Sequence, residues 1–260
     1  MPISRAGDGD VGSVGVRGLA VVVPVCNEQQ YLPRCLTALA VTRRRLPRRP
    51  DPQLQVQVIV VLDRCTDRSA EIVAHWPDVD TVVTDAGLVG VARAAGIARA
   101  LQRSSVPAGQ LWIACTDADS AVPPQWLATQ WQHARAGADV LLGMVTPDAR
   151  ELPAAALLRW QNRHPHREDH DHVFGANFGV RGDMYERAGG FPAVATGEDH
   201  LLVQSVRRLG GRIVASADAP VMTSARQVGR APEGFARYLH DMITGNHSDR
   251  PATRGTVRKR

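Results

Sequence analysis

Lysine is almost absent from this chain of 260 residues: Lys259, next to the C-terminus, is the only one. A phosphate-binding loop of the Walker type requires a lysine that reaches the phosphates. Catalysis through a Schiff base requires a lysine amine in a buried site. Because Lys259 belongs to a terminal tail, both kinds of chemistry are excluded.

Paired cysteines and long apolar runs are also lacking. Cys26, Cys35, Cys65 and Cys115 show no C-x-x-C spacing, which disfavours a zinc or thioredoxin-like site, and we expect reduced thiols. No apolar run approaches the length of a membrane span, and residues 1–18 lack the apolar segment of a signal peptide. The sequence therefore predicts a cytoplasmic protein without a transmembrane segment.

The glycine-rich turn of dinucleotide-binding proteins is missing as well. The first apolar segment, residues 19–25, is followed by Cys26-Asn27-Glu28 rather than by G-x-G-x-x-G. In a dinucleotide site those glycines let the backbone approach a pyrophosphate. A nicotinamide or flavin enzyme is therefore disfavoured.

The chain does contain short apolar segments that alternate with segments of helical spacing. The expected strands are residues 19–25, 56–62, 81–84, 111–116, 140–145 and 173–180. The expected helices are residues 30–41, 69–75, 90–103, 123–135, 154–160, 198–209 and 232–242. This alternation predicts an α/β fold, a Rossmann-related and mostly parallel sheet flanked by helices on both faces, in a single domain.

Acidic and polar residues follow three of the predicted strands. Asn27-Glu28 follows the first, Asp63 the second, and Asp117-Ala118-Asp119 the fourth. Ligands of open parallel sheets bind beyond the carboxyl ends of the strands, so this edge is the candidate active site.

Two acidic motifs can support catalysis there. Asp117 and Asp119 can reach Mg²⁺ or Mn²⁺, ions that are often bound by protein oxygens and substrate phosphates together. The alternative is that Asp119 or Ser120 caps the next helix. Glu198 and Asp199 open a predicted helix, where acids are favoured by the helix dipole. The functional interpretation is that Asp199 acts as a general base toward an acceptor hydroxyl.

Six segments in this order resemble a family 2 glycosyltransferase with the nucleotide-sugar-binding fold called GT-A. They are V-V-V-P-V-C-N-E, V-V-L-D-R-C-T-D, G-V-A-R-A-A-G, T-D-A-D, F-G-A-N-F-G-V-R, and A-G-G-F-P with G-E-D-H, between Leu19 and Arg230. The resemblance implies an inverting transfer of sugar from a nucleotide-sugar donor, a UDP-sugar with a GDP-sugar as alternative, to an unknown hydroxyl acceptor. It also implies Mn²⁺ or Mg²⁺ as cofactor.

The resemblance further implies a role for each matching residue. Pro24, Glu28 and Asp63 would line the base and ribose pocket, and Arg93 would lie beside the nucleotide. Asp119 would bind the cation, Asp117 would approach the ribose or a metal-bound water, Asn177 would border sugar and acceptor, and Asp199 would be the base with Glu198 beside it. The same resemblance divides a GT-A-like domain of residues 19–244 into a nucleotide-binding half, 19–122, and an acceptor half, 123–244.

The sequence departs from the family pattern in two places. Where the family has D-D-G-S-T-D, this chain has Leu62 to Asp67, with Arg64 in place of the glycine. No histidine lies between His200 and His240, where relatives complete the metal site; Arg226 or Arg230 could instead neutralise the diphosphate. The alternatives are a nucleotidyltransferase on a similar fold and a degenerate nucleotide-sugar-binding module.

Two further features have competing interpretations. The formal net charge of +5 equals the charge of residues 250–260, within the tail of residues 245–260, which ends in Arg258-Lys259-Arg260. We interpret it, like residues 1–18, as a flexible terminus, with peripheral contact to an anionic membrane as the alternative and no nucleic-acid partner. The four histidines between His164 and His172 could bind a transition metal, but a mobile polar loop over the acceptor site is the favoured interpretation.

Overall fold

The computed structural model of the chain describes residues 15–46, 54–226 and 234–244. The basic tail and Arg230 lie outside these residues. The division into two halves and the boundaries of the domain stay predictions.

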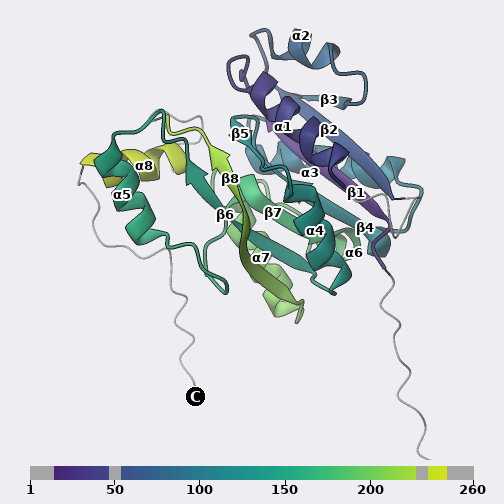
Figure 1. The fold of residues 1–260 in the computed structure, drawn as a ribbon. Coiled ribbons are helices and arrows are strands. Elements are labelled where there is room, and N and C mark those ends of the chain that lie inside the picture. The colour runs from purple at the N-terminus through teal and green to yellow at the C-terminus, as the bar shows by residue number, and fades with distance from the viewer. Residues whose placement is uncertain (1–14, 47–53, 227–233, 245–260) are drawn as a thin grey trace, which may run out of the picture.

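One twisted sheet of eight strands runs through the molecule (Figure 1). In spatial order its strands are β3 (Asp80–Thr84), β2 (Gln55–Asp63), β1 (Gly18–Val25), β4 (Leu111–Cys115), β7 (Phe178–Arg181), β6 (Val140–Pro147), β8 (Ile213–Thr223) and β5 (Ser120–Ala121). The first four are mutually parallel, β7 is antiparallel to both neighbours, β8 is parallel to β6, and β5 is antiparallel to β8. The predicted α/β fold with a mostly parallel sheet is confirmed.

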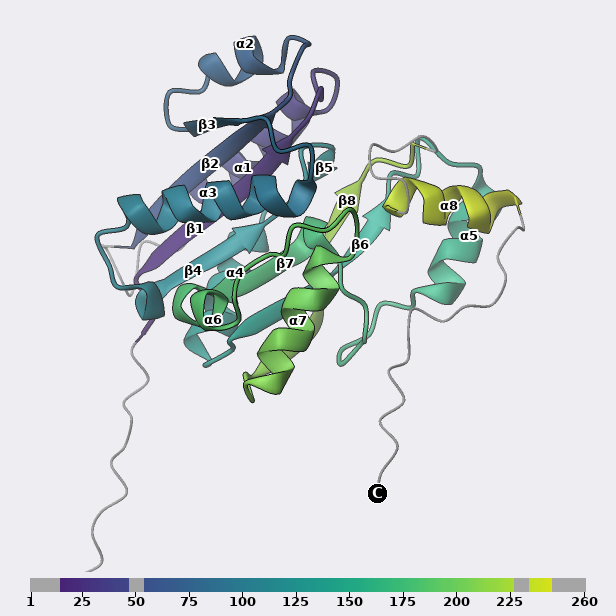
Figure 2. The same cartoon turned by 180° about the vertical axis from the view of Figure 1, so that it is seen from behind.

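Helices cover both faces of the sheet. In Figure 1, α1 (Leu32–Arg44) and α4 (Trp126–Arg135) lie on one face; in Figure 2, α3 (Val89–Arg103), α6 (Gly182–Arg187) and α7 (Glu198–Arg208) cover the other. Successive side chains of a strand point to opposite faces, so Leu19 and Val21 enter one core and Ala20 and Val22 the other. Helix α2 (Ser69–Ala74) lies at the β3 end of the sheet.

Two helices lie side by side at the opposite end. α5 (Ala154–Arg163) and α8 (Phe235–Thr244) pack through Trp160, whose ring meets that of Phe235 at 5.2 Å and that of Tyr238 at 6.0 Å (Figures 1 and 2). None of the described helices is both long and apolar enough to span a bilayer.

The structure differs from the sequence expectations in the second half of the chain. The strand expected over residues 173–180 begins only at Phe178, because Gly175–Asn177 form a short 3₁₀ helix. β8 and α6 were not expected at all. β8 contains Pro220 within a stretch where its register to β6 shifts between Gly143 and Val145, and a proline in such an irregularity hides a strand from a pattern search.

Candidate active site

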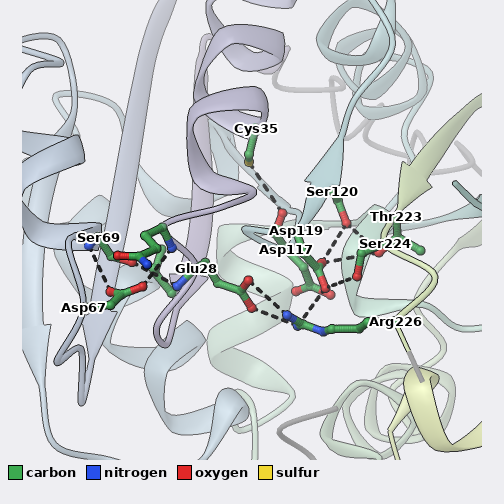
Figure 3. Close-up of polar contacts among 12 residues, drawn as sticks. Glu28, Cys35, Asp67, Ser69, Asp117, Asp119, Ser120, Thr223, Ser224 and Arg226 are labelled. Atoms are coloured by element: carbon green, nitrogen blue, oxygen red, sulfur yellow. Dashed lines mark hydrogen bonds and ion pairs between the residues drawn. The ribbon is translucent and has the colours of Figure 1, made fainter. Parts of the chain in front are cut away.

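The residues that follow β1, β2 and β4 lie along one edge of the sheet, because these strands are parallel neighbours. Glu28 comes from the loop after β1, Asp63 ends β2, and Asp117 and Asp119 follow β4. The strand pair β5–β8 adds Thr223 opposite Ser120, so the end of β8 reaches the same place. Residues nearly two hundred positions apart thus meet at this edge (Figure 3).

Asp119 is buried and surrounded by donors from the end of β8. Its Oδ2 lies 2.8 Å from the Arg226 guanidinium and accepts a hydrogen bond of 2.9 Å from Ser224 Oγ. The hydroxyls of Ser120 and Thr223, themselves 2.9 Å apart, donate to Oδ1 at 3.4 Å. Burial raises the pKa of Asp119, and the nearby Arg226 opposes this shift.

Arg226 also binds a second carboxylate. Its two terminal nitrogens donate to the two Glu28 oxygens at 2.8 and 3.0 Å, a bidentate pair. The backbone N–H of Glu28 in turn donates to Ser69 Oγ at 2.9 Å, which ties the loop after β1 to the start of α2 (Figure 3). Arg226 therefore links that loop to Asp119.

A second arginine, Arg93 of α3, connects the two acidic motifs. Its side chain is 3% exposed and forms ion pairs with Asp117, at 2.6 Å, and with Glu198 at the start of α7. Two glycines leave room for this contact: a Cβ on Gly175 would lie 2.5 Å from the Arg93 guanidinium, and one on Gly90 2.9 Å from Glu198 Cγ. Burial raises the pKa of Glu198, and Arg93 opposes that shift.

Asp199 lies beside this buried pair on the first turn of α7. It is half-buried, and its Oδ1 accepts the backbone N–H of His200 at 2.8 Å. The Glu198 carboxylate pairs with the buried Arg93, and Asp199 is the more exposed acid of this motif.

Asp63 and Pro24 lie farther along the same edge. Asp63 is buried, and its carboxylate accepts hydrogen bonds from the end of β3 and the loop after it: from Thr84 Oγ1 at 3.0 Å, Ala86 N–H at 2.7 Å and Gly87 N–H at 3.0 Å. The next residue, Arg64, has φ 51°, a backbone region that glycine adopts more easily than other residues. This matches the place where the family pattern has glycine. Pro24 is half-buried within β1.

Asn177 is not brought into contact with the acidic cluster. It is buried, its amide nitrogen donates to the carbonyls of Met144 at 2.9 Å and Ala219 at 3.0 Å, and its oxygen accepts from Trp126 Nε1 at 2.8 Å. These contacts join β6, β8 and α4, so in this structure Asn177 is a packing residue.

The histidine tract is partly buried rather than a fully solvated loop. His164 ends α5 and stacks on Trp160 with 3.7 Å between ring centroids, and its ring nitrogen lies 3.2 Å from Tyr238 Oη. The His172 ring lies 4.8 Å from that of His164, and His170 is also buried. Across residues 15–46, 54–226 and 234–244, no group of three or more His, Cys, Asp or Glu side chains is arranged to hold a metal.

Sequence reasoning missed the hydroxyls of Thr223 and Ser224 and the ring of Tyr31. Tyr31 lies between two arginines, with the guanidinium of Arg34 5.6 Å and that of Arg226 5.9 Å from its centroid. The polar run Thr223-Ser224-Ala225-Arg226 carries a signal for the hydroxyls, but within this run the sequence predicts a role only for Arg226.

Comparison with known proteins points to one family. The family model described as glycosyl transferase family 2 matches residues 20–182. No curated protein sequence matches the chain.

Solved structures share the fold at low sequence identity. S. aureus TarS 1–349 in complex with UDP-GlcNAc is 18% identical, with a TM-score of 0.60, over 88% of this chain and 66% of that one. The mannosyltransferase PcManGT from Pyrobaculum calidifontis, in complex with GDP-Man and Mn²⁺, is 19% identical, with a TM-score of 0.59, over 92% of this chain and 67% of that one. Glucosyl-3-phosphoglycerate synthase from Mycobacterium tuberculosis, in complex with Mg²⁺ and UDP, is 16% identical, with a TM-score of 0.52, over 88% of this chain and 79% of that one.

The chain spans only part of some of these proteins. It covers 61% of another TarS 1–349 structure and 36% of a longer TarS structure.

Proposed function

Because the chain belongs to glycosyl transferase family 2, we propose that it transfers a sugar from a nucleoside diphosphate sugar to a hydroxyl group of an acceptor. The observation that supports this most directly is the meeting of Asp117, Asp119, Glu28 and Arg226 beyond the strand ends. This edge is where open α/β sheets bind their ligands. A UDP-sugar is the proposed donor; TarS and PcManGT, of similar fold, are seen with UDP-GlcNAc and GDP-Man respectively.

The residues present fit a divalent cation that is shared with the donor. Mg²⁺ is usually held by one or two carboxylates together with substrate phosphates, and Asp117 and Asp119 provide two carboxylates at one strand end. Within the described residues no third His, Cys, Asp or Glu side chain is arranged with them to hold a metal, and the proposal assigns the remaining ligand positions to phosphate and water oxygens. When bound, Mn²⁺ or Mg²⁺ stabilises the charge of the departing diphosphate.

The protein's own residues are assigned to the remaining steps. Asp199 removes the proton from the acceptor hydroxyl, which then attacks the sugar carbon from the face opposite the diphosphate, so that the configuration inverts. Glu198 and Arg93 hold Asp199 in place through the start of α7. Arg226 contributes positive charge at the diphosphate.

Calorimetric titration of UDP, GDP and their sugar conjugates, with Mn²⁺ and with EDTA, tests the proposal. We expect metal-dependent binding of one nucleotide, lost in Asp119→Ala, while Asp85→Ala, an exposed acid paired with Arg64, is unchanged. If a folded protein binds none of these nucleotides, the donor site is refuted. Release of pyrophosphate from a nucleoside triphosphate would instead identify a nucleotidyltransferase.

A further inference from the structure

The carboxylate proposed to bind the cation already has a positive partner within the protein. Asp119 is only 12% exposed at its side chain, and the Arg226 guanidinium lies 2.8 Å from its Oδ2. A buried carboxylate is costly without a positive or hydrogen-bonding partner. Arg226 therefore supplies to Asp119 the charge that a cation would otherwise supply.

Arg226 is also suited to leave Asp119 for an anion. Its side chain is 26% exposed, and a guanidinium binds phosphate oxygens with the same fork of N–H groups that it uses for carboxylates. It divides its N–H groups between Asp119 and Glu28. A diphosphate placed at this edge would compete for the same N–H groups.

We propose that Arg226 is the internal counter-ion of Asp119, and that it gives up this carboxylate to a divalent cation when its guanidinium moves to the diphosphate of a nucleotide. This rests on the proposed function. Cation and nucleotide then favour each other's binding, and the coupling is the same in both directions. Removal of Arg226 has opposite effects on the two ligands: it tightens binding of the cation alone and weakens binding of the nucleotide.

The test is a Mn²⁺ titration of the full chain without nucleotide. The electron paramagnetic resonance signal of free Mn²⁺ is the readout of this titration. We expect Arg226→Gln to bind Mn²⁺ at least about tenfold more tightly than wild type, because a positive charge beside the ligand is removed. Arg99→Gln is the matched control, because it removes the same charge from an ion pair between α3 and Asp80, the first residue of β3. The Mn²⁺ affinity of Arg99→Gln is expected to equal that of wild type. With Mn²⁺ present, Arg226→Gln is expected to bind UDP or GDP about tenfold more weakly.

Equal or weaker Mn²⁺ binding by Arg226→Gln, with folding verified by circular dichroism, overturns the counter-ion role. If that variant does not fold, Arg226→Met is titrated in the same way and judged by the same outcome. Tighter Mn²⁺ binding with unchanged nucleotide affinity overturns the move of Arg226 to the diphosphate. If wild type binds no nucleotide, the proposed function fails and that move fails with it, whereas the nucleotide-free titration still decides the counter-ion role.

Discussion

Asp117 and Asp119 are two positions apart in the chain, yet each forms its ion pair with a different arginine. Asp117 lies 2.6 Å from Arg93 on α3, and Asp119 lies 2.8 Å from Arg226 after β8. One half of the motif is therefore linked to the start of α7 and the other to the loop after β1. The short acidic motif is the point at which four separate parts of the chain are held together.

Asp199→Asn is expected to lower kcat by a factor of about 10²–10⁴, because the amide cannot accept the acceptor's proton. Donor binding is expected to survive, since Asp199 is assigned to the acceptor and not to the nucleotide. Steady-state kinetics with the donor found by titration, together with its Kd, measure both effects. Loss of donor binding in this variant, but not in the exposed control Asp85→Asn, would remove Asp199 from the role of base.

Arg93→Met is expected to destabilise the fold by about 3–5 kcal/mol, because it leaves Asp117 and Glu198 without a positive partner in a buried place. Urea unfolding at neutral pH measures the free energy of unfolding. The matched control is Arg99→Met, which breaks a half-exposed pair with Asp80 and is expected to change stability by about 0–1 kcal/mol.

The double variant Arg93→Met/Glu198→Gln separates charge from packing. Removing the uncompensated Glu198 charge is expected to recover about 1–2 kcal/mol of the loss in Arg93→Met. If the double variant is as unstable as Arg93→Met alone, the contribution of Arg93 is one of packing and not of charge.

His164 is expected to make the fold sensitive to acid. Burial lowers the pKa of His164 to about 4, below the value of about 6.5 for an unfolded chain. Between these pH values the unfolded state binds more protons than the folded state. The free energy of unfolding therefore has its full value, as far as His164 is concerned, above about pH 6.5, and it decreases as the pH falls toward 4. His164→Phe keeps a ring against Trp160 but cannot be protonated.

Thermal unfolding is measured at about pH 7 and at about pH 5. The Tm of wild type is expected to decrease more between these two pH values than the Tm of His164→Phe. His75→Phe is the control, because His75 is exposed. Equal losses of Tm in wild type and His164→Phe would show that His164 does not sense pH. His170 and His172, whose pKa values burial also lowers, are present in all three proteins.

The sequence was most informative where structure is local. Continuous apolar runs predicted β1, β2 and β4, because strands buried on both faces need no alternation of apolar and polar residues. β8 was missed because it contains Asp218 and Pro220, in a stretch where its register to β6 shifts.

The candidate site shows the same difference between local and distant features. The residues after the strands could be named in advance, since the direction of a parallel strand decides which edge its last residue meets. The pairing of Arg226 with Glu28 could not, because nothing in either segment encodes a contact between residues 198 positions apart. The role of Asn177 at the sugar and acceptor stays a prediction from a motif match; in the structure its amide contacts backbone carbonyls and Trp126.

The Arg93–Glu198 ion pair has a consequence for dissection of the protein. Arg93 comes from the first half of the chain and Glu198 from the second, and both side chains are buried in the intact protein. A fragment that ends near residue 122 would retain an arginine with no acidic partner on α7, and the complementary fragment would retain the unmatched glutamate. Such fragments are expected to remain unfolded alone and to reconstitute only when mixed, and the intact chain is expected to melt in one transition.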